Sequence, residues 1–338
     1  MCSSIKAYKK ALKNNALTVV QTIDYLAGSI SLNRACRVFN ITTQKYYRLK
    51  NKVMCTASVL NLCFKTHPGQ LTIAECTIIK TAINEAHNSH KSLTTIWYQL
   101  MRSNSLFCAS STFYKYASLL SEQVLKTKHI PAKLQLRATR IFEYLHIDTT
   151  LVPSLQQGML RGVIIKDNYS KKILHQAVVN DGSSGAILAV VKEMFTLCNL
   201  QNHPQPITLV SDGGSENKGE VTQWFTTLDA STFTKQIAKT PTFSFTNNQI
   251  ESTFNTFKNK FLNQRAISNK VHLLQELNDF AHYNNNHRYP ISLAGYTPQE
   301  VFEGAIVDKN KFKISIQQAQ TLRYHKNKSA SFCNVCTM

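Results

Sequence analysis

The stretch Tyr144-Leu-His-Ile-Asp148-Thr-Thr places a carboxylate inside a run of largely apolar, β-type residues. A second acid, Asp212, ends the apolar run that begins at Ile207, and a third, Glu251, opens an expected helix. Burying an unpaired carboxylate is costly, so an acid at the end of an apolar strand is badly placed for stability. If the three acids converge, they suit divalent metal ions and phosphoryl-transfer chemistry.

The expected elements around these acids follow the order of an α/β layer fold. Short β-type runs bounded by turn residues are expected at residues 143–149, 160–166, 173–179, 206–211 and 232–237. Helices are expected at residues 182–200, 218–228, 249–263 and 270–284. Three strands, a helix, a strand, a helix, a strand and then helices predict one five-stranded mixed sheet with helices packed on it.

The N-terminal part has apolar residues at helical spacing over residues 17–27, followed by two shorter expected helices. Ser31 is the expected N-cap of the second helix and Thr42 that of the third. A small residue, a tight turn and then a polar, basic helix is the layout of a helix-turn-helix, whose last helix enters the major groove. Its predicted DNA-contacting side chains are Gln44, Lys45 and Arg48. The alternative is a three-helix packing unit with a solvated basic face.

A second helical region follows. Thr72 and Glu75 have the spacing of a capping box, and helices are expected at residues 92–102 and 111–120. This pattern fits a second helix-turn-helix or a purely structural helical pair. The expected segments are 1–56 (helix-turn-helix domain), 65–121 (second helical domain), 122–140 (basic linker), 141–305 (α/β core) and 306–338 (C-terminal tail).

Basic residues outnumber acidic ones by 39 to 19, which gives this chain of 338 residues a net charge of +20. Residues 1–137 hold 19 basic and 4 acidic residues, whereas the other 201 residues hold 20 and 15. A basic N-terminal part predicts a polyanionic partner, with double-stranded DNA the leading candidate and a membrane surface the alternative. No amphipathic helix with a Trp, Phe and Leu face supports the membrane alternative.

The sequence contains no apolar run of about 18 residues or more, and its N-terminus lacks the apolar core of a signal peptide. The nine cysteines are scattered and odd in number, which favours reduced thiols in a cytoplasm over a disulfide framework. Cys333 and Cys336 form a lone CxxC. Free thiols are favoured there over a metal site, because no second pair has zinc-site spacing.

Short motifs occur in a fixed order along the expected core. They are Asp148-Thr-Thr150, Asp167-Asn-Tyr-Ser170, Ser211-Asp212-Gly-Gly-Ser-Glu216, Asn247-x-x-x-Glu251-Ser-x-Phe and Tyr283-Asn-Asn-Asn-His-Arg288, with Leu293 and Thr297-Pro298 after it. In this order they resemble the DDE transposases of the insertion-sequence-three type, whose core is similar to retroviral integrase. Arg34–Leu49 resembles the helix-turn-helix ahead of that core. The chain departs from the pattern at Leu145, where an aromatic residue commonly stands, and in the 38 residues between Asp212 and Glu251.

The resemblance implies a multidomain protein with N-terminal all-α helix-turn-helix units and a ribonuclease-H-like core. It implies that Asp148, Asp212 and Glu251 are the catalytic acids and hold two ions, Mg²⁺ or Mn²⁺. Such ions, about 3.5–4 Å apart, would activate the attacking oxygen and stabilise the leaving one, and oxygen ligands favour them over zinc. The implied partners are the terminal inverted repeats of a mobile element and target DNA, bound by a homo-oligomer in the bacterial cytoplasm at the nucleoid.

Other polar residues of the core are candidates for DNA contact. Asn255 and Lys258 follow Glu251 by four and seven residues, which on a regular helix puts all three on one face. Lys258 would hold a phosphate near the metals, or it is simply solvated. Asn247 would position the start of the helix or a substrate phosphate, and Arg288 would contact DNA or pair with a carboxylate.

The expected function is that of a transposase that cleaves a strand at the element's end and joins the released 3′-OH to another phosphodiester. Two alternatives share the fold. One is a DNA-binding regulator derived from a transposase that has lost catalysis, and the other is a nuclease. Intact acids disfavour the first, and the helical DNA-binding units disfavour the second.

Overall fold

The computed structural model describes residues 15–54, 57–89, 91–121, 136–214, 216, 218–241, 243, 245, 247–263 and 265–330. Most of the predicted basic linker, together with Cys333 and Cys336, lies outside these residues. The chain divides into two compact units. Unit 1 comprises Met1–Glu85, Ser103–Leu125 and Phe312–Met338, and unit 2 comprises Ala86–Arg102 and Lys126–Lys311. These units group residues by contact, and the predicted domain bounds stay predictions.

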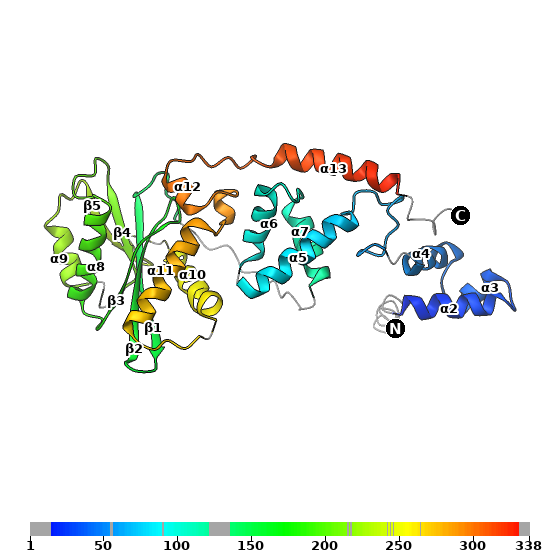
Figure 1. Ribbon diagram of the computed structural model, residues 1–338, viewed down its shortest axis with the longest axis horizontal. Helices are drawn as coiled ribbons and strands as arrows, with labels where there is room; N and C mark the ends of the chain where they lie inside the picture. Colours follow the sequence, from blue (N-terminus) through cyan, green and yellow to red (C-terminus); the bar gives the residue numbers. More distant parts are fainter. Residues whose placement is uncertain are drawn as a thin grey trace. The chain divides into compact units, whose positions relative to one another are not determined.

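Unit 2 is built on one five-stranded mixed sheet in the order β3-β2-β1-β4-β5 (Figure 1). The strands are β1 (Tyr144–Ser154), β2 (Gly158–Asp167), β3 (Ile173–Val179), β4 (Ile207–Ser211) and β5 (Phe233–Ile237). β1, β2 and β3 are antiparallel neighbours, whereas β1, β4 and β5 are parallel neighbours. Tight turns suffice for antiparallel pairs, and parallel pairs need helical crossovers. The predicted ribonuclease-H-like core with its mixed sheet is therefore confirmed.

The first two strands are longer than predicted. Pro153 and Ser154 have the composition of a turn, yet the ladder of β1 continues through them until Ser154 pairs with Gly158. Gly158 has a φ of +67°, which glycine adopts without steric strain. The hairpin therefore closes at this residue, and the exposed side chains of Leu151 and Met159 lie near its tip.

Helices cover both faces of the sheet (Figure 1). They are α8 (Ser184–Leu197) and α9 (Glu220–Thr226) on one face, and α10 (Asn248–Thr256), the π-helix η2 (Phe257–Leu262) and α11 (Lys270–Asn286) on the other. Leu145 and Ile147 of β1 belong to the hydrophobic cluster under α8, whereas Val152 belongs to the cluster under α10 and α11. Because side chains alternate along a strand, His146 and Asp148 share the face of Val152.

The helix that carries Glu251 changes its winding partway along. One continuous helix was predicted over residues 249–263, but α10 ends at Thr256 and η2 follows as a π-helix. A π-helix bonds residue i to i+5, so the residues after the change rotate relative to a regular helix. The seven-residue spacing from Glu251 to Lys258 spans this change, and their shared face stays a prediction.

Unit 2 also contains α6 (Leu93–Arg102), η3 (Ile291–Leu293) and α12 (Pro298–Phe302). α12 opens with a capping box, in which Glu300 N donates to Thr297 Oγ1 (3.2 Å) and Thr297 N donates to Glu300 Oε2 (2.7 Å). The guanidinium of Arg102 in α6 donates to both oxygens of Glu300 (2.7 and 2.9 Å) and to Gly295 O (3.0 Å). Bidentate pairs are geometrically specific, so α6, which was predicted for the second helical domain, is held against the end of the core.

Unit 1 begins with α2 (Ala16–Ala27), α3 (Leu32–Val38) and α4 (Thr43–Met54). Their shared core contains Val19, Val20, Ile23, Ala35, Cys36, Ile41 and Tyr46. Asn40 turns the chain between α3 and α4 with a φ of +49°, a region in which Asn is enriched. Thr42 caps α4 by accepting from Lys45 N (3.2 Å), whereas Ser31 stands at the N-cap position of α3 without a side-chain cap bond. The predicted helix, turn and helix are present, and their DNA-binding role stays a prediction.

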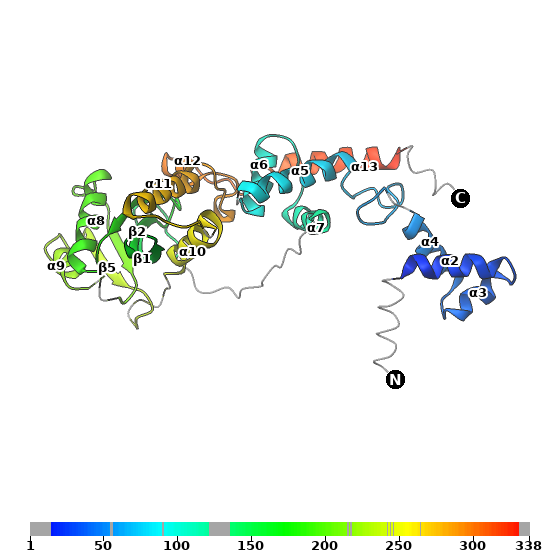
Figure 2. The ribbon, with the colours of Figure 1, turned by 60° about the horizontal axis from the view of Figure 1, so that its bottom comes forward.

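The rest of unit 1 joins distant parts of the sequence. It contains α5 (Ile73–Ser89) as far as Glu85, α7 (Ser110–Leu120) and α13 (Lys313–Lys328), and Figure 2 shows α13 alongside α5. Arg323 of α13 is only 6% exposed, and its guanidinium donates to both carboxylate oxygens of Glu75 at 2.6 to 3.1 Å. Glu75 also accepts from Thr72 N (2.8 Å), and Glu75 N donates to Thr72 Oγ1 (3.3 Å), so the predicted capping box is confirmed. α13 was not predicted, since residues 306–338 were assigned to a tail.

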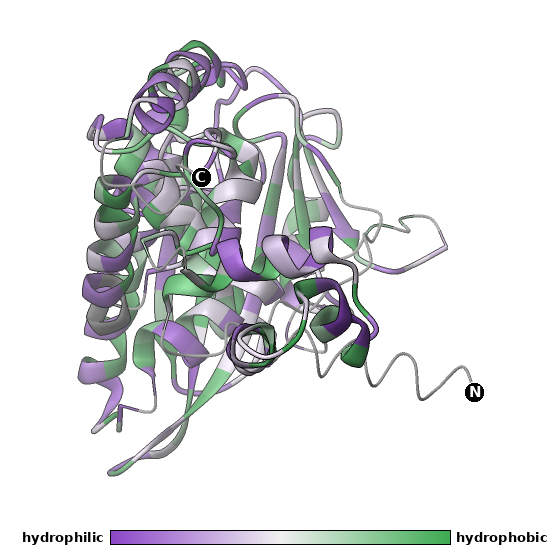
Figure 3. Ribbon diagram, turned by 90° about the vertical axis from the view of Figure 1, so that its right-hand side faces the viewer, coloured by the Kyte–Doolittle hydropathy of each residue, from purple (hydrophilic) through white to green (hydrophobic). Residues whose placement is uncertain are grey.

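The distribution of hydrophobic and hydrophilic residues agrees with this packing of helices. Figure 3 shows bands of hydrophilic and hydrophobic residues alternating along the long helices, as expected where one side of a helix packs and the other faces water. Within the part of the chain that the structure describes, no helix combines the length and apolar character needed to cross a bilayer.

Candidate active site

Asp148 and Asp212 lie on neighbouring parallel strands. The ladder between β1 and β4 ends where His146 pairs with Val210, and Asp148 and Asp212 each lie two residues beyond this pair. Neighbouring strands are about 4.8 Å apart. The carboxylate of Asp212 accepts a hydrogen bond from Gly214 N (3.2 Å), which holds the start of the loop after β4.

Glu251 comes from the helical layer over the same face of the sheet. It lies in the first turn of α10, which packs on β1. Its side chain is 46% exposed, and the ammonium of Lys239, which is 61% exposed, stands 3.4 Å from Glu251 Oε1. Such a solvated ion pair adds little stability. Lys239 follows β5, and its closeness to an acid of the site could not be predicted from the sequence.

The acids interact electrostatically. The pKa of Asp148 is raised to about 7, chiefly by burial and also by the like charges of Asp212, Glu251 and Glu216, against the lowering effect of the Thr149 N–H. The structure therefore brings the three predicted acids, together with Glu216, within electrostatic reach of one another. Their catalytic and metal-binding roles stay predictions.

The raised pKa of Asp148 predicts a pH-dependent stability. Between pH 3.8 and about 7 the folded protein holds a proton here that the unfolded chain releases, so the free energy of unfolding falls as pH rises through this window. Asp148→Asn removes the penalty. In EDTA, Asp148→Asn should melt at a higher temperature than the wild type, and the difference should grow as pH rises from about 5 to 8. The corresponding gain in the free energy of unfolding is on the order of 2 kcal/mol.

Asp279 provides the matched control, because it is an exposed carboxylate of unit 2 on α11. Asp279→Asn should leave the pH dependence of the melting temperature unchanged. A difference between Asp148→Asn and the wild type that is the same at every pH would contradict the shift, and the scan should be made by calorimetry.

Glu216 is a fourth carboxylate that was quoted only as part of a motif. Its Oε1 stands 3.2 Å from Arg161 Nη1 and accepts from Thr149 Oγ1 at 3.4 Å. Arg161 also donates to Thr149 Oγ1 (2.9 Å). The charge of Glu216 is therefore largely met by a guanidinium, which distinguishes it from Asp148.

Asp167, in contrast, is a motif acid with a structural position. It is buried, and its carboxylate accepts from Ser170 N and Ser170 Oγ (both 2.6 Å) and from Phe142 N (2.9 Å). These bonds close the turn between β2 and β3 and fix Phe142, two residues before β1. The motif Asp167-Asn-Tyr-Ser170 thus builds a turn beneath the site.

The acids fit a divalent cation by their donor chemistry. As placed, no three His, Cys, Asp or Glu side chains among the described residues stand close enough to hold a metal ion. Their carboxylate oxygens are nonetheless the hard donors that Mg²⁺ and Mn²⁺ prefer. After burial, the like charges of the neighbouring acids contribute to the raised pKa of Asp148, and a cation would offset this negative charge.

The other predicted contact residues differ in their surroundings. Asn255 and Lys258 are exposed. Asn247 is only 1% exposed and hydrogen-bonds to β1, which supports the positioning role over a phosphate contact. Arg288 is half-buried and donates to Asn284 Oδ1 (3.3 Å), and burial lowers its pKa.

Lys258 borders a mainly apolar cavity of about 370 Å³ between β1 and the end of η2. The cavity is lined by Leu151, Val152, Pro153, Ser154, Leu155, Lys258, Leu262, Arg265, Ala266 and Ile267. Arg265 is already engaged by Glu276 Oε1 (2.9 Å) and Phe261 O (2.7 Å). Lys258 is therefore the cation of this cavity that remains better placed to meet a phosphate.

The predicted DNA-contacting face of α4 is exposed. Gln44, Lys45 and Arg48 all lie on the outside of the helix. Lys50, further along the same helix, instead donates to Asp24 Oδ1 (2.9 Å) and Tyr46 OH (3.0 Å), and these hydrogen bonds raise its pKa to about 12. The helix thus carries basic side chains toward solvent and one that is engaged within unit 1.

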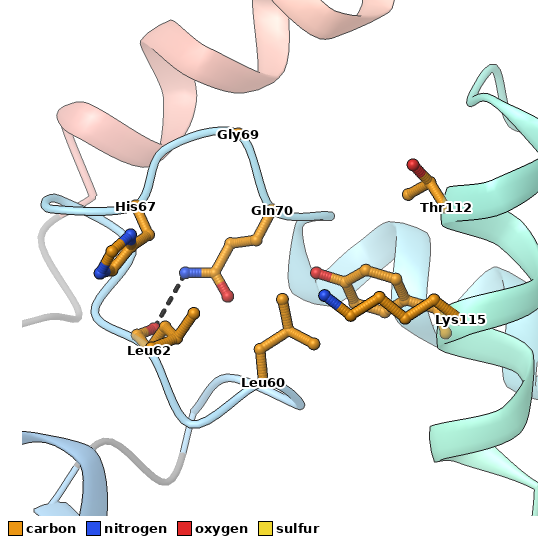
Figure 4. A pocket seen from close by; sticks show the side chains of 8 residues that line it. Leu60, Leu62, His67, Gly69, Gln70, Thr112 and Lys115 are labelled. Carbon is orange, nitrogen blue, oxygen red and sulfur yellow. Dashed lines mark hydrogen bonds between the residues drawn. The ribbon is translucent and has the colours of Figure 1, made fainter. Parts of the chain in front are cut away.

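Unit 1 also contains a smaller cavity of about 330 Å³ between the loop before α5 and α7 (Figure 4). Gln70 forms one wall and donates from Nε2 to Leu62 O (2.9 Å). Lys115 extends from α7 toward the loop, and His67 stands on the far side. Among the described residues that line this cavity none is acidic, so they do not provide the carboxylate donors of a cation site.

The strand order and pairing of this sheet define a ribonuclease-H-like fold. No protein-family model matches the sequence, and no curated protein matches it. The fold is similar to the HTLV-2 integrase catalytic core domain in complex with magnesium (15% identity, 49% of this chain and 99% of that chain, TM-score 0.36).

Two further structures are similar. One is the simian T-cell lymphotropic virus intasome in complex with the PP2A regulatory subunit B56 gamma (10% identity, 67% and 76% of the two chains, TM-score 0.39). The other is the catalytic core domain of BIV integrase (14% identity, 48% and 94%, TM-score 0.32). At these identities and scores the likeness concerns the fold alone.

Proposed function

We propose that the chain is a DDE-type transposase whose motifs resemble the insertion-sequence-three type. The observation that carries the proposal is the convergence of Asp148, Asp212 and Glu251, since the charges of the other two raise the pKa of Asp148. Acids with purely structural roles usually lie apart, as helix caps or in surface turns. Three acids that repel one another destabilise the fold, so their closeness indicates a functional site.

The three carboxylates would hold two Mg²⁺ or Mn²⁺ ions. When bound, these ions supply activation of the attacking oxygen and stabilisation of the leaving one. The chain's own part is to keep Asp148 and Asp212 side by side through the strand register and to present Glu251 from α10. Lys239, beside Glu251, and Lys258, at the cavity between β1 and η2, would hold DNA phosphates.

Two phosphoryl transfers would follow at this one site. Water first attacks a phosphodiester at the element's end, and the broken P–O bond leaves a 3′-OH on the element. That hydroxyl then attacks a target phosphodiester in line, forming one P–O bond as another breaks and releasing a target 3′-OH. Each step exchanges one bond for one bond, so no energy-rich cofactor and no covalent enzyme intermediate are needed.

The basic helical units would supply the DNA affinity. A net charge of +20 fits binding that weakens steeply as salt rises, because phosphate contacts release counterions. The family resemblance adds a homo-oligomer on paired element ends at the bacterial nucleoid.

Arg48→Gln is expected to weaken binding to element-end DNA and to reduce the slope of log affinity against log salt by about 1. Fluorescence anisotropy over a salt series measures both. Lys50→Gln is the control, because it removes the same charge from the same helix but at a side chain engaged by Asp24 and Tyr46. An equal loss in both variants would mean that only net charge matters.

The function is tested by incubating the full chain with oligonucleotides that carry the inverted repeats flanking its gene, in Mg²⁺ or Mn²⁺ and in EDTA. Metal-dependent joining of element 3′ ends to a second duplex supports the proposal. Cleavage without joining indicates a nuclease, and specific DNA binding without cleavage indicates a regulator.

A further inference from the structure

A chain of buried hydrogen bonds runs beneath the acids. Asn168 Nδ2 donates to His146 Nε2 (2.8 Å), His146 Nδ1 donates to Asn247 Oδ1 (2.7 Å), and Asn247 Nδ2 donates to Ile147 O (3.1 Å). The three polar side chains are each only 1% exposed. Because Asn247 must donate to a carbonyl, its oxygen faces the ring, and this fixes the proton of His146 on Nδ1.

The side chain of Asn247 hydrogen-bonds to the strand β1 and not to its own helix. It stands at the N-cap position of α10, where an Asn side chain ordinarily accepts from an N–H of the first turn. It makes no such bond. Both atoms of its amide group are directed to β1, at His146 and at the Ile147 carbonyl, so the residue ties the start of α10 to the strand.

The hydrogen bond between His146 and Asn247 lies at similar distances from the two acids, measured along β1 to Asp148 and along α10 to Glu251. Asp148 lies two residues beyond His146 on the same face of β1, which is about 6.6 Å along a strand. Glu251 lies four residues beyond Asn247, which is about 6 Å along a helix. A bond between His146 and Asn247 therefore sets Asp148 and Glu251 at similar distances beyond it.

Asn168 anchors the far end of the chain. Its Nδ2 also donates to Leu136 O (3.2 Å), and its Oδ1 accepts from Ala138 N (3.1 Å). The segment that leads into the sheet, the turn after β2, and β1 thus share one buried network that ends at the helix of Glu251.

We propose that His146 and Asn247 are positioning residues that set Glu251 against Asp148 for cation binding. The inference rests on the proposed function of these acids as cation ligands. Neither residue touches the substrate. Each acts through the placement of an acid, as residues behind metal ligands commonly do.

The test measures the affinity of the full chain for Mn²⁺ alone, by calorimetry without DNA. His146→Phe and Asn247→Leu should each weaken Mn²⁺ binding about 10- to 100-fold. The double variant should bind Mn²⁺ no more weakly than the weaker-binding of the two single variants. His146→Gln, which can still accept from Asn168 and donate to Asn247, should recover most of the affinity. If Asn247→Leu does not fold, Asn247→Ser removes the same bonds with a smaller side chain and carries the same expectation.

Asn285→Leu is the matched control. Asn285 is a buried amide that exchanges two hydrogen bonds with the backbone of Ile173 (both 2.9 Å), so its loss destabilises unit 2 without disturbing α10. It should lower the melting temperature and keep Mn²⁺ affinity. Unchanged affinity in His146→Phe and Asn247→Leu, additive losses, an equal loss in Asn285→Leu, or a wild type that binds no Mn²⁺ would overturn the inference.

Strand transfer is measured on the same proteins, so the two ideas fail separately. If the wild type binds Mn²⁺ but does not join DNA, and the variants weaken Mn²⁺ binding, the proposed function is overturned and the positioning role is supported. If the wild type joins DNA and the variants leave Mn²⁺ affinity unchanged, the proposed function is supported and the positioning role is overturned.

Discussion

Asp148→Asn is expected to lower the rate of strand transfer by about 10³-fold, because a bound cation contributes several kcal/mol to the transition state and about 4 kcal/mol equals that factor. Asp212→Asn and Glu251→Gln should do the same, while affinity for element-end DNA stays unchanged. Single-turnover rates at saturating DNA and Mn²⁺ separate the chemical step from binding.

Residues that act as a unit give non-additive losses. Combining Asp148→Asn with Asp212→Asn should therefore cost little beyond either change alone. Glu216→Gln, at the carboxylate already met by Arg161, should have a much smaller effect, and Asp279→Asn should have none. Full activity in any one of the three acid variants, with DNA binding intact, would refute the three-carboxylate mechanism.

The second large effect concerns stability. Arg323→Met should destabilise unit 1 by about 3–5 kcal/mol, because it leaves the half-buried carboxylate of Glu75 without its cation. The guanidinium of Arg323 holds both oxygens of Glu75 and donates to Phe107 O (3.0 Å), so three parts of the unit lose a shared contact. Hydrogen exchange of peptides from α5, α7 and α13 gives the opening free energy of this unit directly.

Glu75→Gln supplies the partner variant, since a Gln can still accept from Thr72 at the start of α5. Arg323→Met with Glu75→Gln should regain much of the stability lost in the single variant, because no isolated charge remains. Mn²⁺ affinity should be unaffected throughout, as the acids belong to unit 2. Equal destabilisation in the single and double variants would show that packing of the Arg323 stem matters more than its charge.

Much of the core was predictable because its signals are local. The apolar run before Asp212 and the alternation around Asp148 specify strands over a few residues, and the order of strands and helices restricts the topology. β3, β4 and β5 begin and end within one residue of their predicted bounds. The likeness of the motifs, and not the pattern of apolar residues, indicated which acids to compare.

What the sequence could not reveal are contacts between distant residues. The partners His146 and Asn247 are 101 residues apart, and Glu75 and Arg323 are 248 apart. Neither pair has a local signature, because a His or Arg in an apolar stretch is equally compatible with solvent exposure. The change from α10 to η2 was also hidden, since apolar residues such as Phe257 fit an α-helical period and a π-helical one alike.

The discontinuous make-up of unit 1 has a consequence for biosynthesis. Translation delivers α5 and α7 first, then the five-stranded sheet of unit 2, and only afterwards α13. At about 5–20 residues per second, the 248 residues between Glu75 and Arg323 take roughly 12–50 s to synthesise. Unit 2 can therefore fold while unit 1 is still incomplete, and a ribosome that stops before α13 would yield a complete unit 2 attached to an incomplete unit 1.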